Sequence, residues 1–100
     1  MELYQIDKLK EFKDSGFNRI DLDVTENFKL LMITFKPGQA VPPCIMERHT
    51  AFYIVEGRGK VIASDREEPV QKGSIVLIEP GLSRQIIAHT HLVVLAMQYH

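Results

Sequence analysis

The sequence predicts a single all-β domain, a small barrel of about eight or nine short strands preceded by a short helix. Three observations predict it. The chain has 100 residues, short apolar runs follow one another along it, and glycine, proline and charged pairs separate these runs. A chain of this length forms one domain with its own core. We expect residues 1–16 to form a helical extension and residues 17–100 to form the barrel.

The first element is a short helix, expected over residues 7–14. Asp7 can cap its first turn, and Leu9 and Phe12 lie three residues apart on one face. A serine–glycine pair follows residue 14 and ends the helix, because both residue types favour turns. We expect this helix to lie against the barrel.

The strands are predicted from the spacing of apolar residues. Apolar and acidic residues alternate over Ile20–Val24, which indicates a strand with one buried face. The nearly unbroken apolar run Phe28–Phe35 indicates a strand buried on both faces. Further strands are expected over Ala51–Val55, Lys60–Ala63, Ser74–Ile78, Arg84–Ala88 and Leu92–Met97. The pair Pro42–Pro43 breaks regular pairing, and the charged stretch Asp65–Glu68 forms a hairpin turn.

Composition and charge exclude several classes of function. The net charge is -1 and no run of lysine or arginine is present, so we expect no nucleic-acid surface. No stretch approaches the roughly 20 apolar residues that span a bilayer, and the first residues lack the apolar segment of a secretion signal. The single cysteine, Cys44, cannot form an internal disulfide. These features favour a cytoplasmic protein that binds neither membranes nor nucleic acid.

Two glycine-framed stretches carry a resemblance to a known family. In the first, five residues separate Gly38 from Cys44, and Met46, Thr50 and Gly57 follow. This spacing resembles the first motif of the cupin superfamily, in which two histidines and a glutamate stand between the glycines. Tight barrel turns favour glycine at the ends of the motif, because only glycine adopts a positive φ without steric cost.

The second stretch runs from Gly73 through Pro80 and Gly81 to Arg84. It resembles the second cupin motif, which ends on a histidine. With the strand sequences between the motifs, the resemblance covers residues 28–98. It implies a double-stranded β-helix, or jelly-roll barrel, and a homodimer, since cupins commonly pair.

The residues at the family's metal-ligand positions depart from the pattern. Those positions hold Cys44, Met46, Thr50 and Arg84 in place of two histidines, a glutamate and a third histidine. Threonine is a poor ligand for a first-row transition metal, and a guanidinium has a fixed positive charge and no lone pair to donate. We therefore expect neither a metal nor another cofactor at these positions.

Strand alternation predicts which side chains line the barrel. Cys44, Met46, Thr50 and Phe52 share one parity and should face the interior. Arg84 then either anchors the carboxylate or phosphate of a small anionic ligand or pairs with a carboxylate of the protein at the rim. Cys44 and Met46 can bind a soft metal, but a small buried side chain and a flexible filler are the simpler interpretations.

Four functions remain open at this point. The first, which we prefer, is a small-molecule-binding module with Arg84 as its anchor. The second is a metal-dependent oxygenase or isomerase with relocated ligands, Cys44 with His89 and His91, whose spacing puts both rings on one strand face. The third is a metal-free epimerase or isomerase that uses acid–base residues alone. The fourth is a dimeric scaffold, for which the strand Ile20–Val24 offers a pairing surface.

Overall fold

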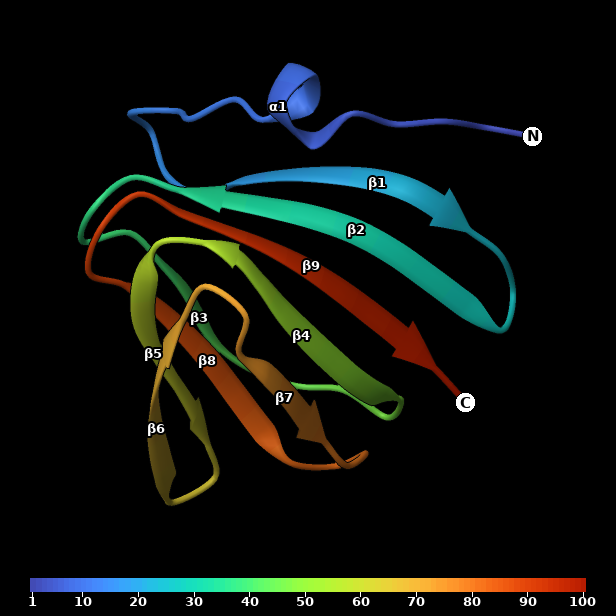
Figure 1. The fold of residues 1–100 in the computed structure, drawn as a ribbon. Coiled ribbons are helices and arrows are strands. Elements are labelled where there is room, and N and C mark those ends of the chain that lie inside the picture. Colours follow the sequence, from blue (N-terminus) through green and yellow to red (C-terminus); the bar gives the residue numbers. More distant parts are fainter.

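Nine antiparallel strands form two facing sheets in the computed structural model, which describes residues 1–100 (Figure 1). The first sheet has the order β1-β2-β9-β4-β7, and the second has the order β3-β8-β5-β6. The strand bounds are β1 (Asn18–Val24), β2 (Phe28–Phe35), β3 (Ala40–Ile45), β4 (His49–Glu56), β5 (Arg58–Ala63), β6 (Arg66–Gln71), β7 (Ile75–Ile78), β8 (Ser83–Ala88) and β9 (Leu92–Tyr99). The all-β jelly-roll prediction is confirmed.

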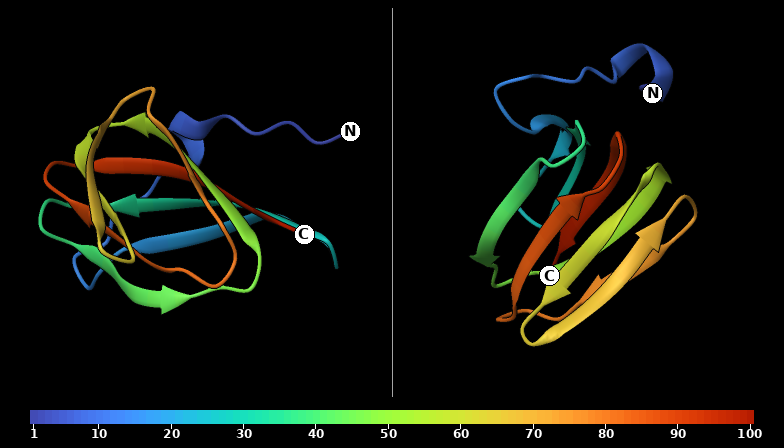
Figure 2. Two further views of the ribbon diagram at one scale, coloured as in Figure 1. Left: turned by 90° about the horizontal axis from the view of Figure 1, so that it is seen from below. Right: turned by 90° about the vertical axis from the view of Figure 1, so that its left-hand side faces the viewer.

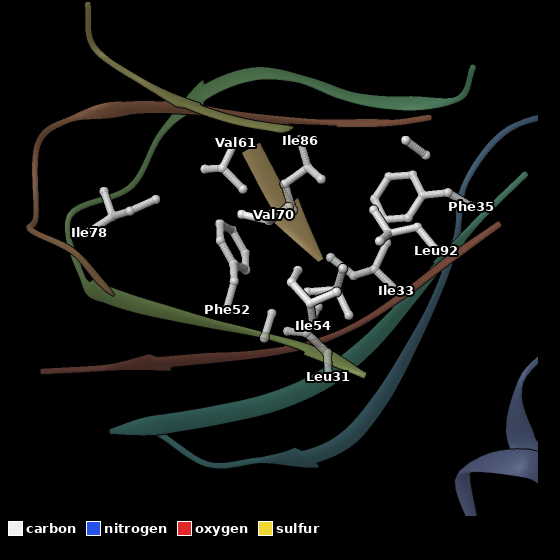
Figure 3. Close-up of a cluster of buried hydrophobic side chains, with 13 residues drawn as sticks. Leu31, Ile33, Phe35, Phe52, Ile54, Val61, Val70, Ile78, Ile86 and Leu92 are labelled. Carbon is white, nitrogen blue, oxygen red and sulfur yellow. The ribbon is translucent and has the colours of Figure 1, made fainter. Parts of the chain in front are cut away.

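The hydrophobic core lies between the two sheets (Figure 3). It contains 13 buried apolar residues, among them Phe35, Ile54 and Leu92 of the first sheet and Val61 and Ile86 of the second. Burial of such side chains stabilises the fold by about 25 cal/mol for each Å² of apolar surface removed from water. Strand β2 is buried on both faces from its fourth residue onward, as its unbroken apolar run predicts.

The helix is shorter than predicted. It spans only Ile6–Leu9, labelled α1, rather than residues 7–14. Asp7 lies in its first turn and does not cap it; the capping position is Gln5, whose side chain makes no capping hydrogen bond. One uncapped turn gives little helical stability by itself. The chain is already extended at Lys10, and no helix of the molecule is long enough to cross a membrane.

The residues after α1 are held by contacts with the barrel instead. The carbonyl oxygen of Glu11 accepts hydrogen bonds from Thr34 and from Asn18 at the start of the first sheet. The ring of Phe12 meets His91 edge-on, with 4.8 Å between ring centroids. These contacts keep the N-terminal segment beside the first sheet, on the side of the molecule away from the tip of the β5–β6 hairpin (Figure 2).

The turns show why the motif glycines are needed. The φ angles of Gly38, Gly57, Gly73 and Gly81 are all positive, between 84° and 91°. At Gly57 a Cβ would also lie 1.9 Å from the carbonyl oxygen of His91, so no other residue fits there. The prediction of positive φ at the motif glycines is confirmed.

Two predicted turns take a different form. Strand β3 runs through Pro42 and Pro43, with a register shift between Val41 and Cys44. Prolines fit here because β3 is an edge strand and one side of it needs no ladder partner. The charged turn is shorter than Asp65–Glu68, because β6 begins at Arg66 and pairs directly with β5.

Candidate functional site

Arg84 lies inside the barrel, as strand alternation along β8 requires. Its side chain is only 3% exposed. The guanidinium donates from Nη1 to the hydroxyl of Thr50, and from Nη2 to the carbonyl oxygens of Glu79 and Leu82 at 3.1 and 3.0 Å. Its Nε donates to Leu82 as well, at 3.2 Å. Arg84 therefore joins β4, β8 and the turn between β7 and β8.

No carboxylate balances the charge of Arg84. The alternative prediction of a carboxylate partner at the rim is wrong, since Glu79 offers only its backbone oxygen and Glu56 pairs with Lys10 at 3.1 Å. Desolvation lowers the pKa of Arg84 from its usual value, and the nearby Cys44 opposes this shift. The guanidinium still carries its charge at physiological pH, and its hydrogen bonds to the Thr50 hydroxyl and to two backbone carbonyl oxygens compensate for the loss of water.

The residues at the cupin metal positions do not fit a divalent cation. The guanidinium of Arg84 already binds the hydroxyl of Thr50, so the only oxygen donor of the set faces a positive charge. Cys44 is the register partner of Arg84 but lies exposed on the edge strand β3. Met46 is half-buried in the turn after β3. The interpretation of Cys44 as a small buried side chain is wrong, because β3 has no neighbour on its outer side.

The three ligands of the relocated metal site do not come together in the fold. Cys44 pairs with Arg84 near the start of β8, whereas His89 and His91 lie in the loop beyond its end. His91 packs against Phe12 instead. No group of three or more histidine, cysteine, aspartate or glutamate side chains comes close enough to hold a metal ion.

The predicted lining is correct for strand β4. Thr50 and Phe52 are buried, 1% and 5% exposed, and face the interior together with Ile54. Phe52, however, belongs to the packed core rather than to an open cavity. His49 lies on the opposite face, exposed and stacked on Tyr99 with 5.2 Å between ring centroids.

An open cleft lies where the two sheets end, between the edge strands β6 and β7. Its volume is about 740 Å³, and its inner wall contains the core residues Val61, Val70 and Ile78, which point toward one another between the sheets in Figure 3. Ala63, Val76 and Leu82 add to the apolar part of the wall, and the exposed Ile75 and Leu77 of β7 border the cleft as well. The rim is polar and carries Ser64, Asp65, Arg66, Glu68, Ser74 and Glu79.

None of the five residues predicted to bind a ligand lines this cleft. The sequence signal for the lining of this cleft is the interior parity of Val76 and Ile78 on a short apolar strand. That signal does not distinguish a cleft from a packed core, because the distinction depends on which strands lie at the sheet edges.

Comparison with known proteins identifies the family. The model of the family described as "Cupin domain" matches residues 31–97. An RmlC-like cupin from Desulfovibrio desulfuricans is 24% identical, with a TM-score of 0.90 over 99% of this chain and 96% of that chain. The protein TT1209 from Thermus thermophilus is 18% identical, with a TM-score of 0.93 over 99% of this chain and 97% of that chain.

A variant of salicylate 1,2-dioxygenase from Pseudoaminobacter salicylatoxidans is 15% identical, with a TM-score of 0.80 over 93% of this chain but only 29% of that chain. At these identities the solved structures establish a shared fold. No curated protein has a significant sequence match to this chain. The family match over most of the length, together with the observed fold, shows that the chain belongs to the cupin family.

Proposed function

We propose that this cupin is a small-molecule-binding module and that the apolar body of its ligand lies in the cleft between β6 and β7. The cleft itself carries the proposal. Its volume of about 740 Å³ falls within the roughly 300–1,000 Å³ of typical ligand pockets. Apolar residues form its inner wall and polar residues its rim, which is the usual arrangement of a small-molecule site.

Arg84 is not the direct anchor for the ligand that the sequence suggests. Its depth and its hydrogen bonds keep the guanidinium away from a ligand at the mouth, so it is a poor direct anchor for an anion. Leu82 lines the cleft while its carbonyl oxygen accepts hydrogen bonds from Arg84. Arg84 therefore acts on the ligand indirectly, by fixing the turn that forms one wall of the cleft.

The cleft favours binding over acid–base catalysis. Its lining contains no histidine, and its carboxylates Asp65, Glu68 and Glu79 are all exposed to solvent. Glu68 is also engaged, since it accepts a hydrogen bond from Arg66 at 3.1 Å. A general base must be held beside the reacting atom in a site that is shielded from water. The exposed carboxylates of this rim are not held in such a site.

Filling the cleft tests the proposal. Phenylnaphthylamine, a neutral apolar dye whose fluorescence rises on burial, should bind the wild-type protein. Val76→Trp places an indole in the cleft and should abolish binding, because the ring takes the volume that the dye needs. Val24→Trp is the matched control, since Val24 is 53% exposed on β1 at the opposite edge of the sheet. Equal binding by the two variants, or none by the wild type, would contradict the proposal.

We also propose that the chain forms a homodimer through the outer face of the first sheet. Tyr53, Ile75 and Leu77 lie on adjacent strands of that face and are 38%, 67% and 69% exposed. Exposed apolar side chains gathered on one sheet face are typical of a contact surface, and a second copy offers the same apolar surface in return. This patch on β4 and β7 replaces the strand Ile20–Val24 as the expected pairing surface.

The oligomeric state tests the dimer. Tyr53→Asp puts a charge in the patch at a position that does not line the cleft, and light scattering should then report the monomer mass where the wild type reports twice that mass. Val24→Asp introduces the same charge away from the patch and should leave the dimer intact. A monomeric wild type would rule the dimer out.

A further inference from the structure

A second hollow lies beside the cleft and has a different chemical character. Its volume is about 370 Å³, and only one of its seven lining residues is hydrophobic. The lining consists of Arg58, Gly59, Pro69, Val70, Gln71, Ser74 and His89. Pro69, Val70 and Ser74 also line the cleft, so the two hollows adjoin at strand β6.

The backbone brings the two basic side chains of the hollow together. The amide groups of His89 and Thr90 donate to the carbonyl oxygen of Arg58, at 3.0 and 3.2 Å. The amide of Arg58 donates in turn to the hydroxyl of Thr90 at 3.0 Å. These bonds fix the loop between β8 and β9 against the start of β5. Arg58 and His89 therefore line one concave surface, although 31 positions separate them in the sequence.

Arg58 is free to bind an anion. Its side chain forms no ion pair, and none of its guanidinium N–H groups donates to another protein group, in contrast to those of Arg84. The lining of the hollow contains no carboxylate that would compete for it. The amide of Gln71 and the hydroxyl of Ser74 add neutral hydrogen-bond donors. This set of donors matches the oxygen atoms of a carboxylate or a phosphate.

We propose that this hollow binds the anionic group, a carboxylate or phosphate, of the ligand whose apolar body occupies the cleft. This inference rests on the proposed function for the apolar part of the ligand. Arg58 supplies a two-pronged donor and His89 supplies a further N–H, while the shared residues connect the hollow to the apolar wall. The ligand class is thus an amphipathic organic anion, and the anchoring role that the sequence suggests for Arg84 moves to Arg58.

Two dyes with one aromatic body separate the two proposals. Anilinonaphthalene sulfonate is the phenylnaphthylamine skeleton with an added sulfonate, so the difference in affinity reports the anionic group. The wild type should bind the sulfonate more tightly than the neutral dye, and salt should reduce that difference. Arg58→Gln should weaken binding of the sulfonate about fivefold, as expected for a partly exposed ion pair, and should leave the neutral dye unaffected.

A matched control removes an arginine elsewhere. Arg19→Gln makes the same charge change on β1, where Arg19 pairs with Asp21 at 3.0 Å far from the hollow, and should change neither affinity. Equal affinities of the wild type for the two dyes would overturn the anionic subsite while leaving the apolar cleft intact. An equal loss of affinity for the sulfonate in Arg58→Gln and Arg19→Gln would do the same.

A titration without the apolar body tests the hollow alone. Inorganic phosphate and acetate, added separately to the wild type, should shift the amide resonances of Gly59, Ser74 and His89, and the ion that shifts them at lower concentration identifies the preferred head group. The shifts should be lost in Arg58→Gln. Shifts without any dye binding would retain the anionic subsite and reject the apolar cleft, and no shift with either ion would reject the subsite.

Discussion

Two regions between the same pair of sheets differ in this molecule, because one is filled by protein groups and the other is open. Around Arg84, where cupin motifs place metal ligands, the protein fills the space with its own guanidinium, a threonine hydroxyl and backbone carbonyl groups. Between β6 and β7 the space stays open and its wall is apolar. The difference follows from sheet order, because β8 has neighbours on both sides whereas β6 and β7 are edge strands.

The difference shows how a cupin barrel can hold its strands together without the metal-ligand residues of the family motifs. A metal ion joins several strands by attracting donors from each of them. Here Arg84 joins strand β4 to the β7–β8 turn through Thr50, Glu79 and Leu82, with the positive charge carried on a side chain. The proposed ligand site lies instead between the edge strands β6 and β7, away from the side chains that hold Arg84.

The largest expected effect on stability comes from removing the guanidinium that fills the space around Arg84. Arg84→Met keeps an unbranched side chain but removes every N–H donor, so the hydroxyl of Thr50 and the carbonyl oxygen of Glu79 lose a buried partner. Removal of the buried charge relieves part of that cost, and a net loss of about 2 kcal/mol in the free energy of unfolding is expected. Urea denaturation measures it.

A control sharpens that experiment. Arg58→Met removes the same functional group from an exposed position without protein partners and should change the stability by less than about 0.5 kcal/mol. Equal stability of the Arg84 variant and the wild type would show that the guanidinium does not hold the strands together, and the contrast between the two regions would then fail.

The sequence predicts the barrel well because each source of that prediction is local. Apolar alternation, the positive-φ glycines and the parity of Thr50 and Phe52 all depend on a few neighbouring residues, and the structure confirms them. The motif spacing likewise identifies the family from glycines that the turns require. The helix is the exception, since contacts from Glu11 and Phe12 to the barrel replace the helical pattern after Leu9.

The candidate site was much harder to predict, because it depends on the order of strands within each sheet. Cys44 has the parity of an interior residue, yet it is exposed because β3 lies at an edge. Val76 and Ile78 have the same apolar pattern as core strands, yet they line a cleft because β7 lies at an edge of the other sheet. Arg58 and His89 meet through backbone hydrogen bonds between the start of β5 and the β8–β9 loop. No short-range pattern in the sequence encodes these relations.

A smaller effect is expected at the boundary between the two regions, which is formed by Leu82. Its half-buried side chain lines the cleft, whereas its backbone carbonyl oxygen accepts hydrogen bonds from Arg84. Leu82→Ala therefore removes apolar wall without removing any acceptor of the guanidinium. The loss of stability should be about 1 kcal/mol, below the roughly 2–5 kcal/mol of a fully buried leucine, because the site is already partly open to water.

Two measurements on Leu82→Ala report on the two regions separately, dye binding on the cleft and amide signals on the surroundings of Arg84. Phenylnaphthylamine should bind more weakly, because the dye loses one of its apolar contacts, while the amide signals of Thr50 and Arg84 should keep their wild-type positions. If those signals move instead, the packing of Leu82 rather than its backbone holds Arg84 in place, and cleft and filled region form one coupled unit. A loss of dye affinity without amide shifts would show that the wall of the cleft can change while the hydrogen bonds of Arg84 stay in place.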